Sequence, residues 1–216
     1  MTMAYTIKEI YYTLQGEGAN TGRPAVFCRF TGCNLWSGHE TDRESAVCQF
    51  CDTDFVGTDG PGGGTFRSAH AVARAIAMTW PTNGNAAGSD PFVVFTGGEP
   101  LLQLDAAIVQ AVHNEGFTIA IETNGTRSAP TGIDWICMSP KAGTELELRT
   151  GNELKLVFPQ AGAEPEQYAS LNFEHFFLQP MDGPNVKANT EQAIAYCLKH
   201  PRWQLSLQQH KLLGLR

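Results

Sequence analysis

The stretch "FVVFTGGEPLLQLDAAIVQAVHNEGFTIAIETNG", residues 92–125, contains a complete strand, helix and second strand. Its two ends, at 92–98 and 117–125, are short apolar runs that finish in Gly, Glu and Asn. The segment between them, 101–116, carries apolar residues at helical spacing and ends at Gly116. Two strands joined through a helix run parallel, because the connection has to cross over the sheet. This unit therefore indicates an α/β fold with a parallel sheet.

The same alternation of strand and helix extends outward from this unit. Four further apolar runs end in Gly, Pro or Lys, at 25–32, 134–141, 153–159 and 175–183. Two further amphipathic helices are predicted at 67–80 and 189–201. The connections after the strands at 134–141 and 153–159 are too short for full helices. We therefore expect an abbreviated, open partial β/α barrel with about six mostly parallel strands, fewer helices than a full barrel, and a site at the C-terminal strand ends.

Length and composition limit the class of protein. A chain of 216 residues is most simply one domain, and we expect residues 1–216 to form it; the Gly-rich stretches 58–66 and 81–90 are predicted loops within it, not linkers. No signal sequence and no apolar run of roughly 20 residues is present, which predicts a soluble, cytoplasmic protein with no membrane partner. A net charge of -7 without a basic cluster argues against nucleic acid as a partner.

Three of the six cysteines, Cys33, Cys48 and Cys51, gather in one polar segment just past a predicted strand end. In a reducing cytosol they are thiols or metal ligands more often than disulfides. A zinc site with His39 as fourth ligand is one interpretation. A 4Fe-4S cluster held by three thiolates leaves one iron open to a substrate or cofactor, and the position at a strand end favours it. The other cysteines lie in apolar runs and are predicted core residues: Cys28, Cys137 and Cys197.

Together with "FTGGEPLLQ" (95–103), the three cysteines resemble the cluster loop and Gly-Gly-Glu-Pro motif of the radical S-adenosylmethionine superfamily. One departure from the superfamily is that fourteen residues separate Cys33 from Cys48, where three is the commonest spacing. We expect a polar turn or short helix over 35–47. Further segments resemble the 7-carboxy-7-deazaguanine synthase family: "TLQGEGANTGRPAVFCRFTGCNL" (13–35), "CDT" (51–53), "ETNGT" (122–126), "SPK" (139–141), "ELKLV" (153–157) and "LQPMDG" (178–183).

The resemblance implies an enzyme of queuosine and deazapurine biosynthesis. In that family 6-carboxy-5,6,7,8-tetrahydropterin is converted to 7-carboxy-7-deazaguanine with loss of ammonia, by a radical that S-adenosylmethionine supplies. The implied cofactors are one 4Fe-4S cluster, S-adenosylmethionine and Mg²⁺. The implied partners are the pterin, an electron donor such as flavodoxin and a second copy of the chain. Two alternatives stay open at this point, a glycyl-radical activating enzyme and a zinc-binding module without catalysis.

The resemblance also implies which residues form the site. Cys33, Cys48 and Cys51 are the implied cluster ligands, and Thr53 is the implied contact of Mg²⁺. Residues implied to line the cofactor are Gly97, Gly98, Glu99, Glu122, Asn124, Ser139, Lys141 and Gln179. Residues implied to bind the substrate are Gln15, Glu17, Arg29 and, from the C-terminus, His210.

Arg29 is informative from its position alone. In the strand at 25–32 it shares one face with Phe27 and Thr31. A parallel barrel strand is buried on both faces, so a charge within it needs a partner. A bound carboxylate, which the planar guanidinium suits, and an ion pair with Glu17 are both open interpretations.

Overall fold

The computed structural model of this chain describes residues 4–81 and 90–215, so residues 82–89 of the loop predicted at 81–90 lie outside the described part. The described strands are β1 (Tyr5–Leu14), β2 (Pro24–Phe30), β3 (Gly64–Phe66), β4 (Phe92–Gly97), β5 (Thr118–Thr123), β6 (Trp135–Met138), β7 (Thr150–Phe158), β8 (Asn172–Pro180) and β9 (Trp203–Leu205). The described α-helices are α1 (Ala69–Thr79), α2 (Ala106–Asn114), α3 (Val186–Lys199) and α4 (Gln209–Leu213). Three short 3-10 helices are η1 (Glu40–Ser45), η2 (Pro100–Leu102) and η3 (Pro165–Gln167).

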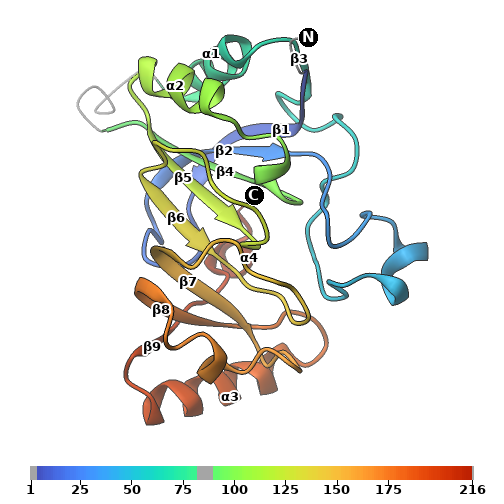
Figure 1. Cartoon of the computed structure of the whole chain (residues 1–216), viewed down its shortest axis with the longest axis vertical. Helices are drawn as coiled ribbons and strands as arrows, with labels where there is room; N and C mark the ends of the chain where they lie inside the picture. Colours follow the sequence, from blue (N-terminus) through green and yellow to red (C-terminus); the bar gives the residue numbers. More distant parts are fainter. Residues whose placement is uncertain (1–3, 82–89, 216) are drawn as a thin grey trace.

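The strands form one nine-stranded sheet in the order β3-β1-β2-β4-β5-β6-β7-β8-β9 (Figure 1). From β2 to β9 all neighbours run parallel, and β1 runs antiparallel to both β2 and β3. In the described chain the edge strands β3 and β9 do not pair, so the sheet stays open. The predicted open, partial β/α barrel is confirmed.

The sheet has more strands than expected, because β1, β3 and β9 give weak signals in the sequence. In β1 the register shifts between Ile7 and Glu9, and this irregularity interrupts the alternation of apolar and polar residues. Strands β3 and β9 contain three residues each, which is too short for a period to be detected.

The predicted helix at 101–116 is split in the structure. Pro100 begins the short helix η2, and α2 does not begin until Ala106. The side chain of Asp105 accepts a hydrogen bond from the backbone N–H of Ile108 at 2.9 Å. An N-cap of this kind satisfies a donor that the first helical turn leaves free, so the helix starts afresh at Asp105.

Side chains alternate between the two faces of the sheet. Cys28 and Phe30 of β2 are fully buried in the core beneath α1 and α2, whereas Phe27 and Arg29 lie on the opposite face and border a cavity. This division of β2 confirms the two faces expected from its sequence. The same alternation continues through β8, where Phe176 and Leu178 are core residues and Gln179 borders the cavity.

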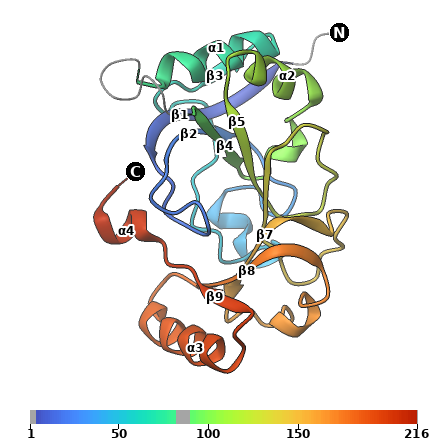
Figure 2. The same ribbon diagram turned by 90° about the vertical axis from the view of Figure 1, so that its left-hand side faces the viewer.

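Helices cover the face of the sheet that lies away from the cavity. Helices α1 and α2 pack over the first strands, and α3 packs against β8 and β9 (Figures 1 and 2). The first core contains Ile76 of α1 and Ile108 of α2, and the second contains Ala193 of α3 with Trp203 of β9. On the opposite face, a smaller apolar core is formed by Ala25, Phe92, Val94 and Ala120, and polar side chains border the cavity.

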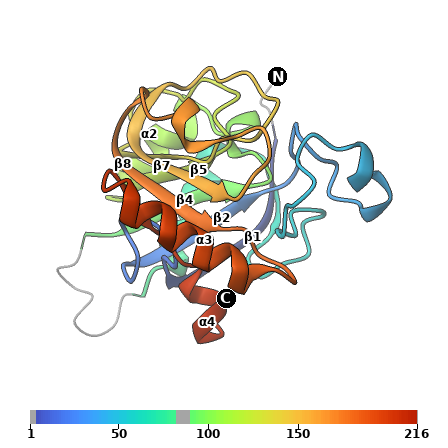
Figure 3. The same ribbon diagram turned by 90° about the horizontal axis from the view of Figure 1, so that it is seen from below.

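The long segment between β2 and β3 projects from the body of the molecule (Figures 1 and 3). It contains η1, which confirms the short helix expected between the first two clustered cysteines. The guanidinium of Arg43 lies 4.0 Å from the ring centroid of Trp36 and donates hydrogen bonds to the backbone oxygens of Gln49 and Cys51, each at 3.0 Å. These contacts tie Trp36, near the start of the segment, to the stretch that contains Cys48 and Cys51.

Stability should depend strongly on the core beneath α1 and α2. Phe95 is fully buried, and its ring centroid lies 5.8 Å from that of Phe30. We expect Phe95→Ala to lower the free energy of unfolding by about 3–5 kcal/mol, through lost burial and the cavity left behind. Met78→Ala, on the exposed side of α1, should change it by less than about 0.5 kcal/mol. Equal midpoints of the two variants in urea denaturation would contradict this core.

Candidate functional site

A cavity of about 710 Å³ opens at the C-terminal ends of the strands. Its wall combines strand ends, the projecting segment and the chain around α4. All predicted site residues except Glu99 border it: Gln15, Glu17, Arg29, Cys33, Cys48, Cys51, Thr53, Gly97, Gly98, Glu122, Asn124, Ser139, Lys141, Gln179 and His210. The structure thus brings together residues that are up to 195 positions apart in the sequence (15 to 210).

The three clustered cysteines border this cavity, and they lie near enough to one another for the charge of one thiolate to raise the pKa of the next. All six described cysteines are free, and burial raises the pKa of the Cys33 and Cys48 thiols. In the described residues no three His, Cys, Asp or Glu side chains are placed to hold one metal ion, and His39 is exposed, away from the cavity wall. Three soft sulfur donors facing one open space fit an iron–sulfur cluster.

Lys141 is a half-buried cation beside these thiols. Its ammonium donates to the backbone oxygen and the hydroxyl of Ser139, at 2.6 and 2.8 Å. Burial lowers the pKa of Lys141, while the nearby Cys48 and Cys51 thiols favour its charged form. A cation at this position opposes the negative charge that thiolates carry.

The glycine pair of the "TGGEP" motif permits a close approach between two strand ends. A Cβ atom on Gly97 would lie 2.6 Å from the backbone oxygen of Phe30, and one on Gly98 would lie 2.2 Å from that of Gly32 and 2.8 Å from Cβ of Cys33. The motif therefore packs directly against the end of β2 that leads into the first cysteine. Both glycines also border the cavity.

Glu99 does not border the cavity, although the resemblance implied a cofactor contact. Its carboxylate is fully buried and accepts hydrogen bonds from Leu101 N–H (2.9 Å), the Thr123 hydroxyl (2.7 Å) and Asn124 N–H (2.8 Å). Its own N–H donates to the backbone oxygen of Gly32 at 2.9 Å. Glu99 thus braces the ends of β2, β4 and β5 against one another.

Asn124 combines a turn with a position in the site. Its Oδ1 accepts from the N–H and hydroxyl of Thr126, at 3.0 and 2.7 Å, in the manner of an Asx turn. Its Nδ2 donates to Asn34 Oδ1 at 3.1 Å. Because Asn34 follows Cys33, this contact joins the "ETNGT" turn to the first cysteine.

The loop at 15–22, after β1, lies between the ends of the last strands and the C-terminal segment. Gly18 N–H donates to the Ser206 hydroxyl at 2.9 Å, and Ala19 N–H donates to Glu153 Oε2 at 3.0 Å. Gln209 N–H donates to the oxygen of Gly16 at 2.9 Å. Figure 2 shows α4 beside the β1–β2 connection. Polar contacts, in place of strand pairing, therefore join the two ends of the open sheet; we call this contact region the seam.

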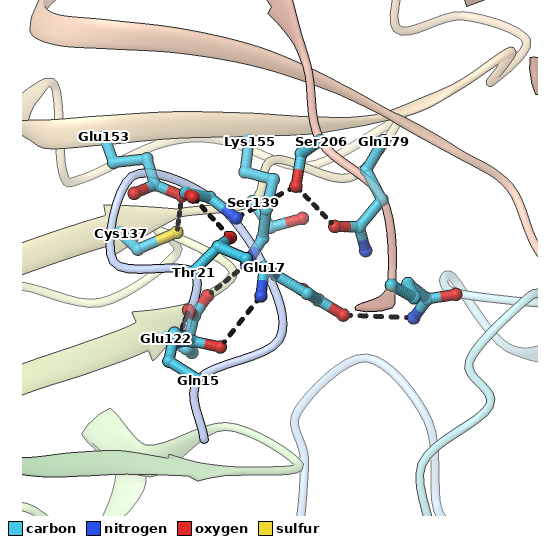
Figure 4. Close-up of polar contacts among 12 residues, drawn as sticks. Gln15, Glu17, Thr21, Glu122, Cys137, Ser139, Glu153, Lys155, Gln179 and Ser206 are labelled. Atoms are coloured by element: carbon cyan, nitrogen blue, oxygen red, sulfur yellow. Dashed lines mark hydrogen bonds and ion pairs between the residues drawn. The ribbon is translucent and has the colours of Figure 1, made fainter. Parts of the chain in front are cut away.

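The predicted substrate residue Glu17 lies in the seam and meets Lys155 of β7 (Figure 4). Lys155 Nζ lies 2.7 Å from Glu17 Oε2 and 2.9 Å from Glu122 Oε2. Burial would raise the pKa of Glu17, but the charge of Lys155 lowers it to about 2. Burial raises the pKa of Glu122, against the opposing effect of Lys155. Glu17 is therefore a charged acceptor on the cavity wall at neutral pH.

Arg29 is paired with Glu9, and not with Glu17. Its Nε donates to Glu9 Oε1 at 2.9 Å, and one terminal nitrogen donates to the Tyr11 hydroxyl at 3.3 Å. A guanidinium has five N–H donors, of which these two contacts use two, and Arg29 borders the cavity.

The C-terminal segment adds His210 to the cavity wall. Gly16 makes room for it, since a Cβ at Gly16 would lie 2.5 Å from Nδ1 of His210. Burial lowers the pKa of His210. The neighbouring Lys211 contacts Asp52 and Asp182, so α4 is attached both to the cysteine segment, next to Thr53, and to the end of β8.

Several residues of the cavity wall were not expected from the sequence. Lys155 carries a recognisable signal, because it is a charge within an apolar strand, as Arg29 is. Each of the others has another polar residue next to it, and nothing in the sequence singles it out: Lys8, Glu9, Asp52, Gln208 and Lys211.

No protein-family model matches this chain. A 7-carboxy-7-deazaguanine synthase from Bordetella pertussis is 63% identical over 213 residues, which cover 99% of this chain and 100% of the relative. One from Bradyrhizobium diazoefficiens is 61% identical, with 99% and 100% covered. A crystal structure of QueE from Escherichia coli is similar with a TM-score of 0.72 and 28% identity, over 96% of this chain and 95% of that one.

No helix in the described residues has the length and apolar character needed to cross a bilayer.

The bracing by Glu99 can be tested through stability. Glu99→Gln keeps the shape but replaces one acceptor oxygen with a donor, which then faces backbone N–H or hydroxyl donors. We expect a loss of about 1–3 kcal/mol in the free energy of unfolding. Glu115→Gln makes the same chemical change at an exposed position after α2 and should stay within about 0.5 kcal/mol of the parent. If both variants unfold with the parent's midpoint in urea, the brace is not formed.

Proposed function

The chain belongs to the 7-carboxy-7-deazaguanine synthase family, and from this premise we propose which of its residues carry out the family's reaction. It is a radical S-adenosylmethionine enzyme, a lyase of queuosine biosynthesis that converts 6-carboxy-5,6,7,8-tetrahydropterin to 7-carboxy-7-deazaguanine. Membership replaces the two alternatives that the sequence left open, the glycyl-radical activating enzyme and the zinc-binding module.

One observation supports the assignment of roles more than any other. A single cavity has three thiols near one another in its wall and, elsewhere in the same wall, the ionised Glu17 and the guanidinium of Arg29. Soft sulfur donors suit iron, whereas a carboxylate and a guanidinium suit the polar edge and the carboxylate of an anionic heterocycle. The wall therefore has separate groups for a cluster and for the pterin.

We assign the cluster to Cys33, Cys48 and Cys51, with Lys141 as its neighbouring cation. S-adenosylmethionine is assigned to the ends of β4, β5 and β6, where Gly97 and Gly98 expose backbone. The chemistry that these two groups supply when bound is one-electron cleavage of S-adenosylmethionine and abstraction of a hydrogen atom from C6 of the pterin. Further residues assigned to the cofactor are Glu122, Asn124, Ser139, Lys141 and Gln179, while Glu99 acts on it only by bracing the strand ends.

We assign the pterin to Gln15, Glu17, Arg29 and His210. The charged Glu17 accepts hydrogen bonds from the amino group and ring N–H of the aminopyrimidinone, and the free N–H groups of Arg29 bind the substrate carboxylate. Because the bicyclic pterin ring is bound at both ends, the orientation of its C6 atom is fixed. Orientation of this kind lowers the activation barrier of many catalysed reactions by several kcal/mol or more, about 7–11 kcal/mol at most. Burial of the substrate in the cavity keeps water from the reacting atoms.

The other features that the family implies are part of the proposal. We propose one domain over 1–216, supported by the continuous sheet and by a cavity wall drawn from both ends of the chain. We propose a cytoplasmic protein, supported by six free cysteines. An electron donor such as flavodoxin and a homodimer complete the proposal by resemblance alone.

Product formation and iron content test the function together. Protein reconstituted with iron and sulfide without oxygen, and supplied with reductant and S-adenosylmethionine, should convert 6-carboxy-5,6,7,8-tetrahydropterin to 7-carboxy-7-deazaguanine, detected by mass spectrometry. Cys33→Ala, Cys48→Ala and Cys51→Ala should each lose cluster iron and product. Cys28→Ala, a buried cysteine outside the cavity, should keep both. The function is wrong if the parent holds a full cluster and forms no product, and the ligand assignment is wrong if Cys28→Ala empties the site while Cys33→Ala leaves it full.

We propose that Mg²⁺ binds beside Thr53, which borders the cavity two positions after Cys51. Magnesium keeps several waters and takes oxygens from substrate, so the protein alone should bind it weakly. Turnover should rise with added Mg²⁺, and Thr53→Val should lower it at least about tenfold, or ~1.4 kcal/mol. Calcium, with its longer and looser coordination, should replace Mg²⁺ badly. Thr41→Val, on exposed η1, is the matched control, and full activity of Thr53→Val in metal-stripped buffer would remove the ion from the reaction.

A further inference from the structure

Lys155 is a buried lysine that serves two parts of the cavity wall at once. It is 3% exposed, and its ammonium contacts Glu17 from the loop after β1 and Glu122 from the end of β5. Figure 4 shows the lysine reaching toward these carboxylates from β7. One cation therefore neutralises a residue assigned to the pterin and a residue assigned to the cofactor.

The surroundings of Lys155 are rich in acidic groups. Glu153, two positions away on β7, is also buried, and it accepts hydrogen bonds from Ala19 N–H at 3.0 Å and from the thiol of Cys137 at 3.4 Å. Three carboxylates thus gather around one ammonium. The titratable and charged groups that face this cluster are Glu17 from the seam loop, Glu122 from β5, Cys137 from β6, Lys141 after β6, Glu153 and Lys155 from β7, and His210 from α4.

Neutral donors complete the contacts of the two carboxylates. Gln15 Nε2 donates to Glu122 Oε1 at 3.2 Å, and Gln208 Nε2 donates to Glu17 Oε1 at 3.1 Å. Amide donors orient a carboxylate, but they do not balance its charge. The charge balance of this part of the wall therefore depends on Lys155.

We propose that Lys155 is the positioning residue of the pterin site, which keeps the Glu17 carboxylate charged and directed into the cavity. The inference rests on the proposed function, because it takes the pterin as the ligand of Glu17. A charged carboxylate accepts hydrogen bonds at both oxygens, whereas a protonated one carries a donor where the pterin also has donors. Lys155 acts on the substrate through Glu17, without contact of its own.

The proposal has a consequence for the pH dependence of binding. Burial favours the neutral form of Glu17, and the charge of Lys155 overcomes this effect, with smaller contributions from Gln208 and His210. Without Lys155 the pKa of Glu17 rises, so Glu17 is protonated at low pH and recovers its charge as pH increases through the raised pKa. Pterin binding by a Lys155→Met variant should therefore be weakest at low pH and recover as pH rises, while Glu17 of the parent stays charged throughout.

The test measures binding of 6-carboxypterin, the oxidised and fluorescent form of the substrate, to the holoenzyme with S-adenosylmethionine and Mg²⁺. The dissociation constant is measured from about pH 6 to about pH 9 for the parent and for Lys155→Met. At each pH the constant of the variant is divided by that of the parent, and in this ratio the titration of the ligand cancels. We expect this ratio to fall about tenfold per pH unit below the raised pKa of Glu17. Lys155→Arg, which keeps the charge, should give a ratio that does not change with pH.

Lys8→Met is the matched control for loss of a buried lysine. Lys8 also borders the cavity and bridges two carboxylates, at 2.9 Å from Asp54 and 2.7 Å from Asp59, but it contacts neither Glu17 nor Glu122. The ratio of the dissociation constant of Lys8→Met to that of the parent should not change with pH. A pH-dependent ratio for Lys8→Met as large as that for Lys155→Met would overturn the specific role of Lys155.

Product formation by the parent separates this inference from the proposed function. If the parent forms product while the ratio for Lys155→Met is independent of pH, the role of Lys155 is wrong and the function stands. If the parent forms none, the function itself fails. If Lys155→Met does not fold, a double variant that combines Lys155→Met with Glu122→Gln removes one carboxylate together with the cation. The same fall in the ratio is expected for this double variant, and a ratio that does not change with pH overturns the proposal.

Discussion

The ion contacts of Lys155 with Glu17 and Glu122 hold together a site that strand pairing leaves open. In a closed barrel, hydrogen bonds between the first and last strands would fix the two ends of the sheet. Here those ends are joined by the seam, where the loop at 15–22 contacts the ends of β7 to β9 and the chain before α4. Because the seam contains buried polar groups, among them Glu153, Lys155 and Ser206, these groups need partners, and Lys155 provides the charge that the carboxylates require.

The arrangement of the cavity follows from the alternation of side chains along the strands. Apolar residues at every second position of β2 and β7 face the helices, so the charged residues between them, Arg29 and Lys155, face the cavity and find partners there. The motif at 97–99 connects this wall to the segment that contains the clustered cysteines. Its glycines allow contact with the end of β2, and the carboxylate of Glu99 accepts hydrogen bonds from Thr123 and Asn124 at the end of β5. Cluster ligands and substrate residues are thus fixed by one set of strand ends.

The sequence predicts the parallel part of this fold and most of its site, because strong local patterns mark both. The strand–helix–strand unit at 92–125 and the clustered cysteines are of that kind, and fifteen of the sixteen predicted site residues border the cavity. It does not predict β1, whose alternation is interrupted at a shift of register, or the partner of Arg29, which is Glu9 from that same strand. The role of Lys155 depends on long-range contacts, since Glu17 is 138 positions away (155 − 17).

The central claim is that the polar contacts of the seam, in place of strand pairing, join the two ends of the sheet. Amide hydrogen exchange of the reconstituted protein without substrate tests it directly, because the amides of Gln15, Gly18, Ala19 and Gly22 all donate hydrogen bonds within the seam loop or to its neighbours. The account predicts slow exchange for a peptide that covers 15–22, comparable to the neighbouring strand β1. Exchange of that peptide as fast as an exposed loop would contradict it.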